Sequence, residues 1–549
     1  MMIETAGLFL LFLGFAAFAT KRSLTYMHIY QQEEYDSARF LRWIFKEGGF
    51  DKRLSFMLAL CAGAALFIPE IAAQFVFFTA FVMSAYFEKD PRREAKKKLV
   101  LTRRAQRIFF PALALSIFST LWCFFLPSFY GLWIVNVQLV PFFIVLVNAA
   151  LQPYENKVQK VFWQEAHDKV LDYNPHIIAI TGSFGKTSVK HILGHILKMH
   201  APSLITPGSV NTPMGITRII REELEPRHQY FIVEMGAYGP GSIARLCALT
   251  PPDTGVITAI GHAHYERFKS LETVAEAKYE LAEAVLRKQD GLMIVNENTL
   301  RFDKAKALQQ AHAKQFVVCG DAPESKAKDK KEKKEDIPGH LEVHKIVQEL
   351  EGLLVRLSWK GASYDLKAPL YGTHHGHNLA LAFVTAFELG LGPEDILSAL
   401  KTLPQIAHRL EVKPQGRDMI VIDDAYNSNP IGFQSALGLL ATLAQKSGGK
   451  IKRKILITPG MVELGPAHTE AHETIGRLAG QVCDVALVVN GQRIPSFLEG
   501  FKATGGQKEL HEVASFAEAQ SWVAANRQDG DAVLIENDLP DLYERKLRL

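Results

Sequence analysis

Hydrophobic residues gather in the first 152 positions of the chain, where apolar stretches alternate with polar loops. The stretches cover residues 3–20, 55–68, 71–87, 108–126 and 132–151. A helix needs roughly 20 apolar residues to cross a bilayer, so the pattern predicts a transmembrane region of about five helices over residues 1–152. Read as one helix, residues 55–87 would be about 50 Å long, which exceeds the bilayer. We therefore predict a hairpin that turns at Pro69-Glu70.

Lysines and arginines in the loops orient these helices. The loops after the first and the third stretch are rich in both, whereas the turns at residues 69–70 and 127–131 contain neither. By the positive-inside rule both basic loops are cytoplasmic, which places the N-terminus outside and everything after Gln152 in the cytosol. The first stretch could instead be a signal peptide, but it lacks a basic n-region and an AxA-like cleavage site.

Three polar side chains, Asn136, Gln138 and Asn148, interrupt the last stretch. Hydrogen bonds between membrane helices are the commoner role of such residues. A transport or lipid site is the alternative, although no chain of intramembrane acids marks a pump.

The pattern changes beyond residue 152. Residues 153–174 form an amphipathic linker, and from Pro175 short apolar runs alternate with helical patterns, as a parallel α/β sheet requires. The first α/β block covers residues 175–407 and the second covers residues 408–549. Strand-like runs occur at residues 176–180, 230–233, 254–260, 291–295, 315–319, 419–423, 454–458, 485–489 and 532–535. Residues 342–359 and 363–370 instead resemble antiparallel strands.

Composition narrows the possible functions. The 549 residues include 62 Lys and Arg against 58 Asp and Glu, and this near balance argues against a nucleic-acid partner. The five cysteines form no CxxC pair, which excludes a zinc ribbon and gives no disulfide framework, so reduced thiols are expected. Residues 325–336 are almost wholly charged, which predicts a solvated loop.

A glycine-bounded loop follows the first strand of the α/β region. The apolar run 177–180 leads into Gly182, Ser183, Phe184, Gly185, Lys186, Thr187 and Ser188, and a helical pattern begins at Val189. The amides of such a loop hold phosphate oxygens at a helix N-terminus, its lysine reaches the terminal phosphates, and its hydroxyl can ligate Mg²⁺. The GxxxxGK[ST] spacing is incomplete because Ile180 takes the first glycine position. We nevertheless predict nucleotide binding.

Acidic and basic residues follow other strands. Glu234 ends the run 230–233, where an acid can hold Mg²⁺ or form an ion pair. His264 also follows a strand. It can ligate a metal there or serve as a packing residue. Lys278 lies in a helical pattern and would read alone as an exposed lysine.

A second set of candidate residues lies further along the chain. Three histidines precede a helix at residues 374–377, which is weak evidence for a metal site. Asp423 and Asp424 end a strand after Arg409, a common place for a ribose or substrate contact.

Taken together, these clusters resemble the Mur ligase family, and within it the enzymes that add D-alanyl-D-alanine to a UDP-MurNAc peptide. The resemblance covers about residues 175–549 and rests on an ordered set of short motifs. They are ITGSFGKTSVK (180–190), the asparagine and glycine of NTPMGI (211–216), EMGA (234–237), AHYERFKS (263–270), AEAKYE (275–280), GHN (376–378), HRLE (408–411), DDAYNSNP (423–430) and GMVELG (460–465) with His472. It implies a P-loop central ligase domain followed by a Rossmann-like C-terminal domain.

The resemblance also implies roles for individual residues. Gly182 to Ser188 would hold the ATP phosphates, and Lys186 would neutralise them. Thr187 and Glu234 would bind one Mg²⁺, while His264 and a carbamylated Lys278 would bind a second. Asn378 would contact adenine, and Arg409 and Asp424 would reach the phosphates and ribose. The implied reaction converts a carboxylate and ATP into an acyl phosphate, which an amine then captures.

The substrate is left open, because nothing before Pro175 resembles the UDP-sugar domain of the soluble family members. One hypothesis is a membrane-tethered ligase of peptidoglycan synthesis in the bacterial inner (cytoplasmic) membrane, which joins an amino acid or dipeptide to a small-molecule or lipid-linked precursor. A second is the same chemistry on another carboxylate, either poly-γ-glutamate-like or lipid-linked. A third is a non-catalytic nucleotide-binding scaffold. The oligomeric state is not predicted.

Overall fold

The computed structural model describes residues 2–46, 49–93, 95, 98–126, 129–261, 268, 270–323, 339–415, 419–425, 428–462 and 464–537. His264 and the charged segment 325–336 lie outside these ranges, so the expectations for them stay untested. The chain divides into two compact units, an N-terminal unit that ends at Lys160 and a second unit that begins at Val161.

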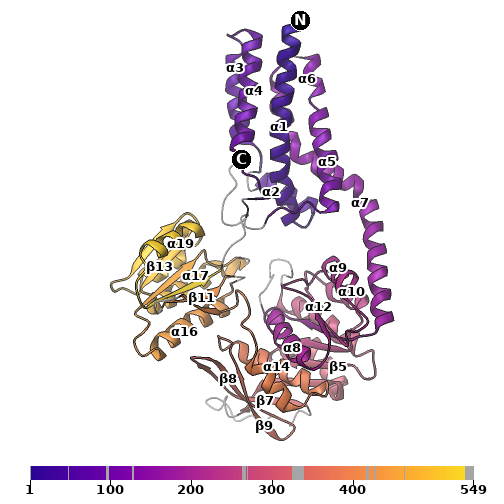
Figure 1. Cartoon of the computed structure of the whole chain (residues 1–549), viewed down its shortest axis with the longest axis vertical. Helices are drawn as coiled ribbons and strands as arrows, with labels where there is room; N and C mark the ends of the chain where they lie inside the picture. The colour runs from indigo at the N-terminus through magenta and orange to yellow at the C-terminus, as the bar shows by residue number, and fades with distance from the viewer. Residues whose placement is uncertain are drawn as a thin grey trace. The chain divides into compact units, whose positions relative to one another are not determined.

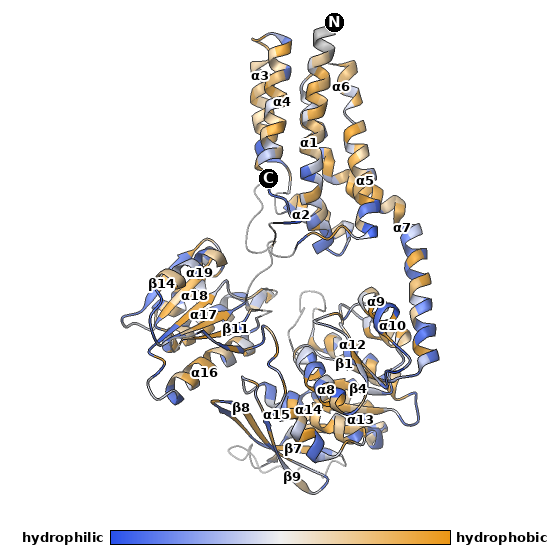
Figure 2. Cartoon of the chain, in the orientation of Figure 1, coloured by the Kyte–Doolittle hydropathy of each residue, from blue (hydrophilic) through white to orange (hydrophobic). Residues whose placement is uncertain are grey.

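The N-terminal unit is a bundle of apolar helices (Figure 1). Its helices are α1 (Met2–Gln32), α2 (Ser37–Lys46), α3 (Lys52–Ala64), α4 (Glu70–Phe87), α5 (Arg103–Phe118), α6 (Leu121–Phe125) and the first part of α7 (Gly131–Tyr173). Within the described residues, four segments are long and apolar enough to cross a membrane: 6–32, 70–87, 103–125 and part of 131–173. Figure 2 shows that apolar residues predominate along these helices.

The helix pair α3 and α4 confirms the hairpin and changes the expected number of spans. The two helices pack side by side (Figure 1), and the chain reverses between them at residues 65–69. However, α3 has 13 residues. It is therefore about 20 Å long, short of the roughly 30 Å of a bilayer core. In a membrane, such a hairpin would return the chain to the side it came from, as the expected orientation of the basic segments requires.

Helix α1 extends well beyond Thr20, the expected end of the first stretch. Arg22 lies inside this helix rather than in a loop, and its guanidinium is 2.9 Å from carboxylates of both Asp51 and Glu88. Thr25 Oγ1 also donates to Glu88, at 2.5 Å. These partners compensate the buried charge, which lets a helix continue where the apolar pattern ends.

The polar residues of α7 connect helices. Gln138 Nε2 donates to Ser55 Oγ at 2.6 Å and to the Asp51 carbonyl at 2.8 Å. Ser119 Oγ donates to Asn136 Oδ1 at 2.5 Å. Helix-to-helix hydrogen bonding, the commoner of the two interpretations, therefore accounts for Asn136 and Gln138.

Residues 153–173, expected as a linker, are the last part of α7 and carry a polar face (Figure 2). In the second unit, Ala166 and Val170 of this helix are buried in the core of the first α/β domain.

The first α/β domain is built on a nine-stranded sheet in the order β2-β3-β1-β4-β5-β6-β7-β8-β9. The strands are β1 (His176–Thr181), β2 (Ser203–Ile205), β3 (Tyr230–Glu234), β4 (Thr254–Ile257), β5 (Leu292–Asn296), β6 (Phe316–Asp321), β7 (His340–Glu349), β8 (Gly352–Trp359) and β9 (Ala362–Ala368). Strands β1–β7 run parallel, and β8 and β9 extend the sheet antiparallel. The predicted parallel sheet and the antiparallel segment are both confirmed.

Helices cover both faces of this sheet because successive side chains of a strand point to opposite sides. Ile178 and Ile180 of β1 pack against one layer, while Ile177 and Ala179 pack against the other. The first layer contains α8 (Lys186–His200), α14 (His375–Glu388) and α15 (Pro393–Lys401). The second contains α9 (Pro213–Glu223), α10 (Ser242–Leu249), α12 (Leu271–Val285) and α13 (Asp303–Ala311).

The second α/β domain contains a six-stranded sheet in the order β10-β11-β15-β12-β13-β14, parallel except for β10. Its strands are β10 (Glu411–Pro414), β11 (Ile420–Asp424), β12 (Arg453–Thr458), β13 (Val485–Val489), β14 (Glu509–Val513) and β15 (Asp531–Glu536). Helices α16 (Pro430–Lys446), α17 (His468–Val482) and α18 (Pro495–Lys502) pack on one face, and α19 (Phe516–Ala525) packs on the other. All five cysteines of the chain are unpaired, as expected.

Candidate active site

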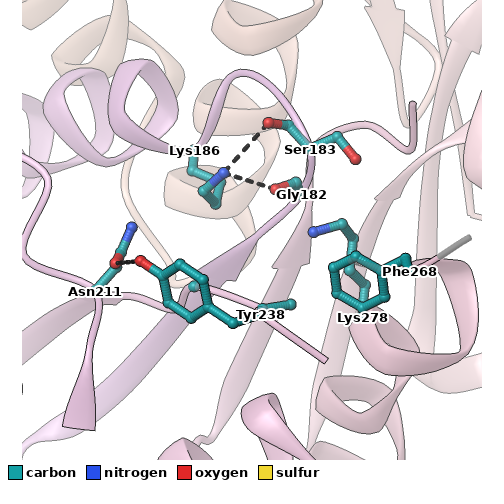
Figure 3. A pocket seen from close by; sticks show the side chains of 9 residues that line it. Gly182, Ser183, Lys186, Asn211, Tyr238, Phe268 and Lys278 are labelled. Atoms are coloured by element: carbon teal, nitrogen blue, oxygen red, sulfur yellow. Dashed lines mark hydrogen bonds between the residues drawn. The ribbon is translucent and has the colours of Figure 1, made fainter. Parts of the chain in front are cut away.

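The loop between β1 and α8 has the shape of a phosphate-binding loop. Gly185 precedes the first residue of α8 in a left-handed conformation, with φ of 83°. Lys186 folds back over the loop, and its Nζ donates to the carbonyls of Gly182 at 2.7 Å and Ser183 at 3.3 Å (Figure 3). The amine is therefore held above the loop at the N-terminus of α8, where the helix dipole and the free amides favour an anion.

Neighbouring elements fix this loop from two sides. Ser183 Oγ exchanges hydrogen bonds with the backbone of Gly261 after β4, both at 3.0 Å, and Thr258 Oγ1 donates to the Phe184 carbonyl. On the other side, Asn378 of α14 lies against Gly185: a Cβ added there would be 2.5 Å from Asn378 Oδ1. The structure thus places Asn378 beside the loop, and its expected contact with adenine stays a prediction.

Glu234 lies beside the loop because β3 is the neighbour of β1, with Glu234 in register with Ile180. One carboxylate oxygen accepts from Thr187 Oγ1 at 3.0 Å and from Lys190 Nζ at 2.9 Å. The other accepts from Asn211 Nδ2 at 3.2 Å. Glu234 is thus both an acid beside the phosphate loop and a partner in a buried ion pair.

This group of residues fits a magnesium ion. The Thr187 hydroxyl and the Glu234 carboxylate are adjacent oxygen donors, which is the ligand type that Mg²⁺ prefers. The expectation of a second ion depends on His264, which is outside the described residues, and on Lys278.

Lys278 reaches the same pocket from α12. The pocket, which is open to solvent, has an empty volume of about 310 Å³. It is lined by Gly182, Ser183, Lys186, Asn211, Gly236, Ala237, Tyr238, Phe268 and Lys278 (Figure 3). Burial, and then the nearby Lys186, hold the pKa of Lys278 well below its usual value. The sequence alone suggested an exposed lysine, but only 4% of this residue is exposed.

Burial and three neighbouring charges shift the pKa of Lys186. Burial lowers its pKa most, the Glu234 carboxylate opposes that shift, and the charges of Arg409 and Lys190 lower it further. Arg409 therefore acts on the phosphate loop through its charge. Asp424, at the end of β11, accepts from the Leu410 amide at 3.2 Å, and Arg409 also favours its ionised form.

The histidines at 374–377 do not form a metal site. His374 Nδ1 is 3.0 Å from Ser435 Oγ, whereas His377 Nε2 is 2.9 Å from Asp321. Burial and Arg409 lower the pKa of His374 to about 4, so it is neutral at physiological pH.

One cluster of potential metal ligands does occur in the described residues, at His408, Glu411 and Asp423. Lys413 Nζ lies 2.9 Å from both carboxylates, so a lysine ammonium already occupies the space between them.

Two residues at these sites, Tyr238 and Glu536, were not among the candidates from the sequence. Tyr238, which directly follows EMGA, donates to Asn211 Oδ1 at 3.1 Å (Figure 3). Glu536, at the end of β15, is fully buried opposite Asp424. The only sequence signal near Glu536 was the predicted strand at residues 532–535, which ends just before it.

Comparison with known proteins agrees with this geometry. Residues 180–386 match the Mur ligase middle domain, and residues 408–536 match the Mur ligase glutamate ligase domain. A relative from Mycobacterium leprae, UDP-N-acetylmuramoyl-tripeptide–D-alanyl-D-alanine ligase, is 31% identical over 376 residues, or 66% of this chain and 70% of that protein.

Two solved structures share the fold. MurF from Acinetobacter baumannii matches with a TM-score of 0.56 and 26% identity, over 69% of this chain and 77% of that one. MurF from Thermotoga maritima, solved in complex with ADP, matches with a TM-score of 0.55 and 22% identity, over 71% and 82%. Both domain matches, the similarity to the Mycobacterium leprae ligase and the order of the motifs lead to the same conclusion. The chain belongs to the Mur ligase family of ATP-dependent amide ligases.

Proposed function

We propose that this protein is a membrane-anchored peptide ligase that adds D-alanyl-D-alanine, or a similar amine, to a muramyl-peptide precursor of peptidoglycan. The observation that carries the proposal is the convergence of Lys186, Lys278, Asn211 and Gly236 on one pocket, with Thr187 and Glu234 beside it. The similarity to the Mycobacterium leprae ligase supports this choice of substrates.

We propose that two Mg²⁺ ions bind in this pocket. Thr187 and Glu234 would hold one, and His264 and Lys278 would hold the other. A neutral amine reacts with CO₂ to give a carbamate and a proton, and the lowered pKa of Lys278 favours the neutral amine. When bound, the metal ions neutralise phosphate charge and polarise the transferring phosphoryl group.

The protein's own groups account for the remaining steps. The loop amides and Lys186 hold the phosphates of ATP, and this positive charge offsets the repulsion as a carboxylate oxygen attacks the γ-phosphorus. The bond to ADP breaks, and an acyl phosphate forms. The amine then attacks the acyl carbon, inorganic phosphate leaves, and the nitrogen loses a proton as the amide forms.

We also propose that the protein spans the bacterial cytoplasmic membrane several times and that its ligase domains face the cytoplasm. The four long apolar helices support membrane association. The basic segments beside α4 and the use of ATP support the cytoplasmic orientation.

The second candidate function is the same ligation on another carboxylate, either lipid-linked or poly-γ-glutamate-like. The membrane helices favour it, since they occupy the part of the chain before the ligase domains and a membrane anchor suits a lipid-linked substrate.

The test is ADP release by the purified full-length protein with Mg²⁺. We expect release that requires both UDP-MurNAc-tripeptide and D-alanyl-D-alanine, with the joined product detected by mass spectrometry. ADP formed only with a lipid-linked precursor or another acid would replace this proposal with the second candidate.

Two lysine variants show whether the protein is an enzyme at all. Lys186→Ala should abolish ADP release, whereas Lys198→Ala, at an exposed site on the same helix, should not. If no acid and amine pair yields ADP with the unmodified protein, the non-catalytic scaffold becomes the better account.

A further inference from the structure

Two carboxyl groups meet at the end of the second sheet. Strands β11 and β15 are parallel neighbours, and Asp424 is in register with Glu536. Asp424 is 8% exposed and Glu536 is 0% exposed. Because paired residues on adjacent strands point to the same face, the two acids are held side by side away from water.

The partners of these acids are unequal. Asp424 Oδ1 accepts from the Leu410 amide at 3.2 Å, and the charge of Arg409 acts on it. Glu536 Oε1 accepts from Ser428 Oγ at 2.6 Å. Among the described residues, Glu536 Oε2 has no donor, although the atom is buried. An ionised oxygen buried without a donor is strongly unfavourable.

One proton resolves this arrangement. If Glu536 is protonated, its hydroxyl can donate to the Asp424 carboxylate, and both groups are then satisfied with a single negative charge. The electrostatic environment agrees: burial and then Asp424 raise the pKa of Glu536 well above its usual value, and burial raises that of Asp424 to about 6. The other charged group that acts on Asp424 is Asp423, which Lys413 already pairs.

We propose that Asp424 and Glu536 share one proton, and that Glu536 is thereby a positioning residue that keeps Asp424 oriented toward the nucleotide. The resemblance to the Mur ligases implies that Asp424 helps to reach the phosphates and ribose of ATP, and the inference rests on that role within the proposed function. Loss of the shared proton would place two like charges together, turn Asp424 away and weaken nucleotide binding. Affinity should therefore be full while the proton is held and fall as pH rises beyond its loss.

The test measures the affinity of the full-length protein for the ATP analogue AMP-PNP with Mg²⁺ at pH 7 and pH 9. Glu536→Gln keeps a donor toward Asp424 but cannot titrate. A site linked to one proton loses at most tenfold in affinity per pH unit. We expect the unmodified protein to lose about tenfold more affinity than Glu536→Gln over this range. The lysines in and beside the phosphate loop affect the pH dependence of binding equally in both proteins. The difference between their affinity losses therefore reports only on Asp424 and Glu536.

Two further variants sharpen the result. Ser428→Ala removes a hydrogen bond that favours ionised Glu536, so the alkaline loss of affinity should move to higher pH. Glu509→Gln, at an exposed site on the same sheet, should follow the unmodified protein. Identical pH profiles for the unmodified protein and Glu536→Gln would overturn the inference, and so would an unmoved profile in Ser428→Ala.

Infrared spectroscopy of the nucleotide-free protein tests the pair independently of ligase function. We expect a protonated carboxyl band at pH 8 that is missing from Glu536→Gln. If this band is present but no nucleotide binds, the proposed function fails while the shared proton stands. If nucleotide binds and the band is absent, the shared proton is wrong.

Discussion

At the scale of single residues, Glu234 is held in the candidate active site by four hydrogen bonds. Its backbone amide donates to Thr206 Oγ1, and its carboxylate accepts from Thr187, Lys190 and Asn211. Each contact removes rotational freedom from an acid that the proposed mechanism uses as a metal ligand. The same contacts make the carboxylate sensitive to residues that never touch the metal.

Tyr238 is one such residue. Its hydroxyl donates to Asn211 Oδ1, which leaves the Asn211 amide nitrogen to face Glu234. Tyr238→Phe should therefore loosen the amide and raise the Mg²⁺ concentration for half-maximal ADP release by about fivefold, since one hydrogen bond contributes about 1 kcal/mol. Tyr364→Phe in β9 is the matched control. Equal Mg²⁺ requirements in the two variants would contradict this role.

Buried Lys278 should lower the stability of the folded protein, although the proposed reaction needs it. Its pKa is lowered in the folded protein, so below about pH 10.4 the unfolded chain binds a proton that the folded chain excludes. The loss of stability therefore grows as pH falls from that value toward the lowered folded pKa. Lys278→Met should raise the melting temperature at pH 7.5 in bicarbonate-free buffer and abolish ADP release.

The pH dependence separates this effect from simple hydrophobic packing. The gain in melting temperature should be smaller at pH 10 than at pH 7.5, and Lys306→Met, at an exposed site, should show no gain. A gain that is the same at both pH values would mean that the titration of Lys278 is not its cause.

The resemblance to the Mur ligases predicted which residues lie together but not which neighbours hold them in place. Lys186, Thr187, Glu234 and Lys278 belong to its motifs, and the structure brings these four together. Tyr238 and Glu536 carry no such pattern. The partner of Glu536 depends on which strand lies beside β11, and that pairing is a property of the folded sheet alone.

At the scale of elements, the junction of β1 and α8 forms the candidate phosphate-binding loop. The turn reverses the chain within a few residues, and it needs a left-handed residue at Gly185 immediately before the helix. Because Asn378 lies against the same position, even a methyl group has no room there.

Gly185→Ala tests this junction. A left-handed conformation costs a residue with a Cβ about 1–2 kcal/mol, so ATP affinity should fall by about tenfold or more. Gly438→Ala is the control, since nothing lies within 4 Å of a Cβ there and alanine favours a helix. Isothermal titration with AMP-PNP measures both. Unchanged affinity in Gly185→Ala would show that the loop adapts.

Long apolar runs correctly predicted the central strands and the long N-terminal helices. Short or polar elements were not predicted. Strand β2 has three residues, and β10 and β14 are mostly polar edge strands of the second sheet. These strands form because a neighbouring strand offers its hydrogen bonds, which a local hydrophobic pattern does not encode. The extension of α1 through Arg22 was missed for a similar reason, since its carboxylate partners come from distant segments.

At the scale of the whole molecule, one chain combines helices that are long and apolar enough to cross a bilayer with domains of an ATP-dependent ligase family. These two features restrict the orientation, because ATP is available on the cytoplasmic side only. The α3–α4 hairpin is compatible with this orientation, since it leaves both neighbouring basic segments on one side regardless of how deeply α3 enters the membrane.

Sealed vesicles can test this orientation without altering the protein. In inverted vesicles from cells that produce the full-length chain, ATP, UDP-MurNAc-tripeptide and D-alanyl-D-alanine added outside should yield ADP at once. In right-side-out vesicles the same additions should yield ADP only after detergent opens the membrane. The Lys186→Ala variant supplies the background in both preparations. Immediate activity in intact right-side-out vesicles would place the ligase domains outside, and activity that carbonate washing releases from the membrane would show that the apolar helices do not span it.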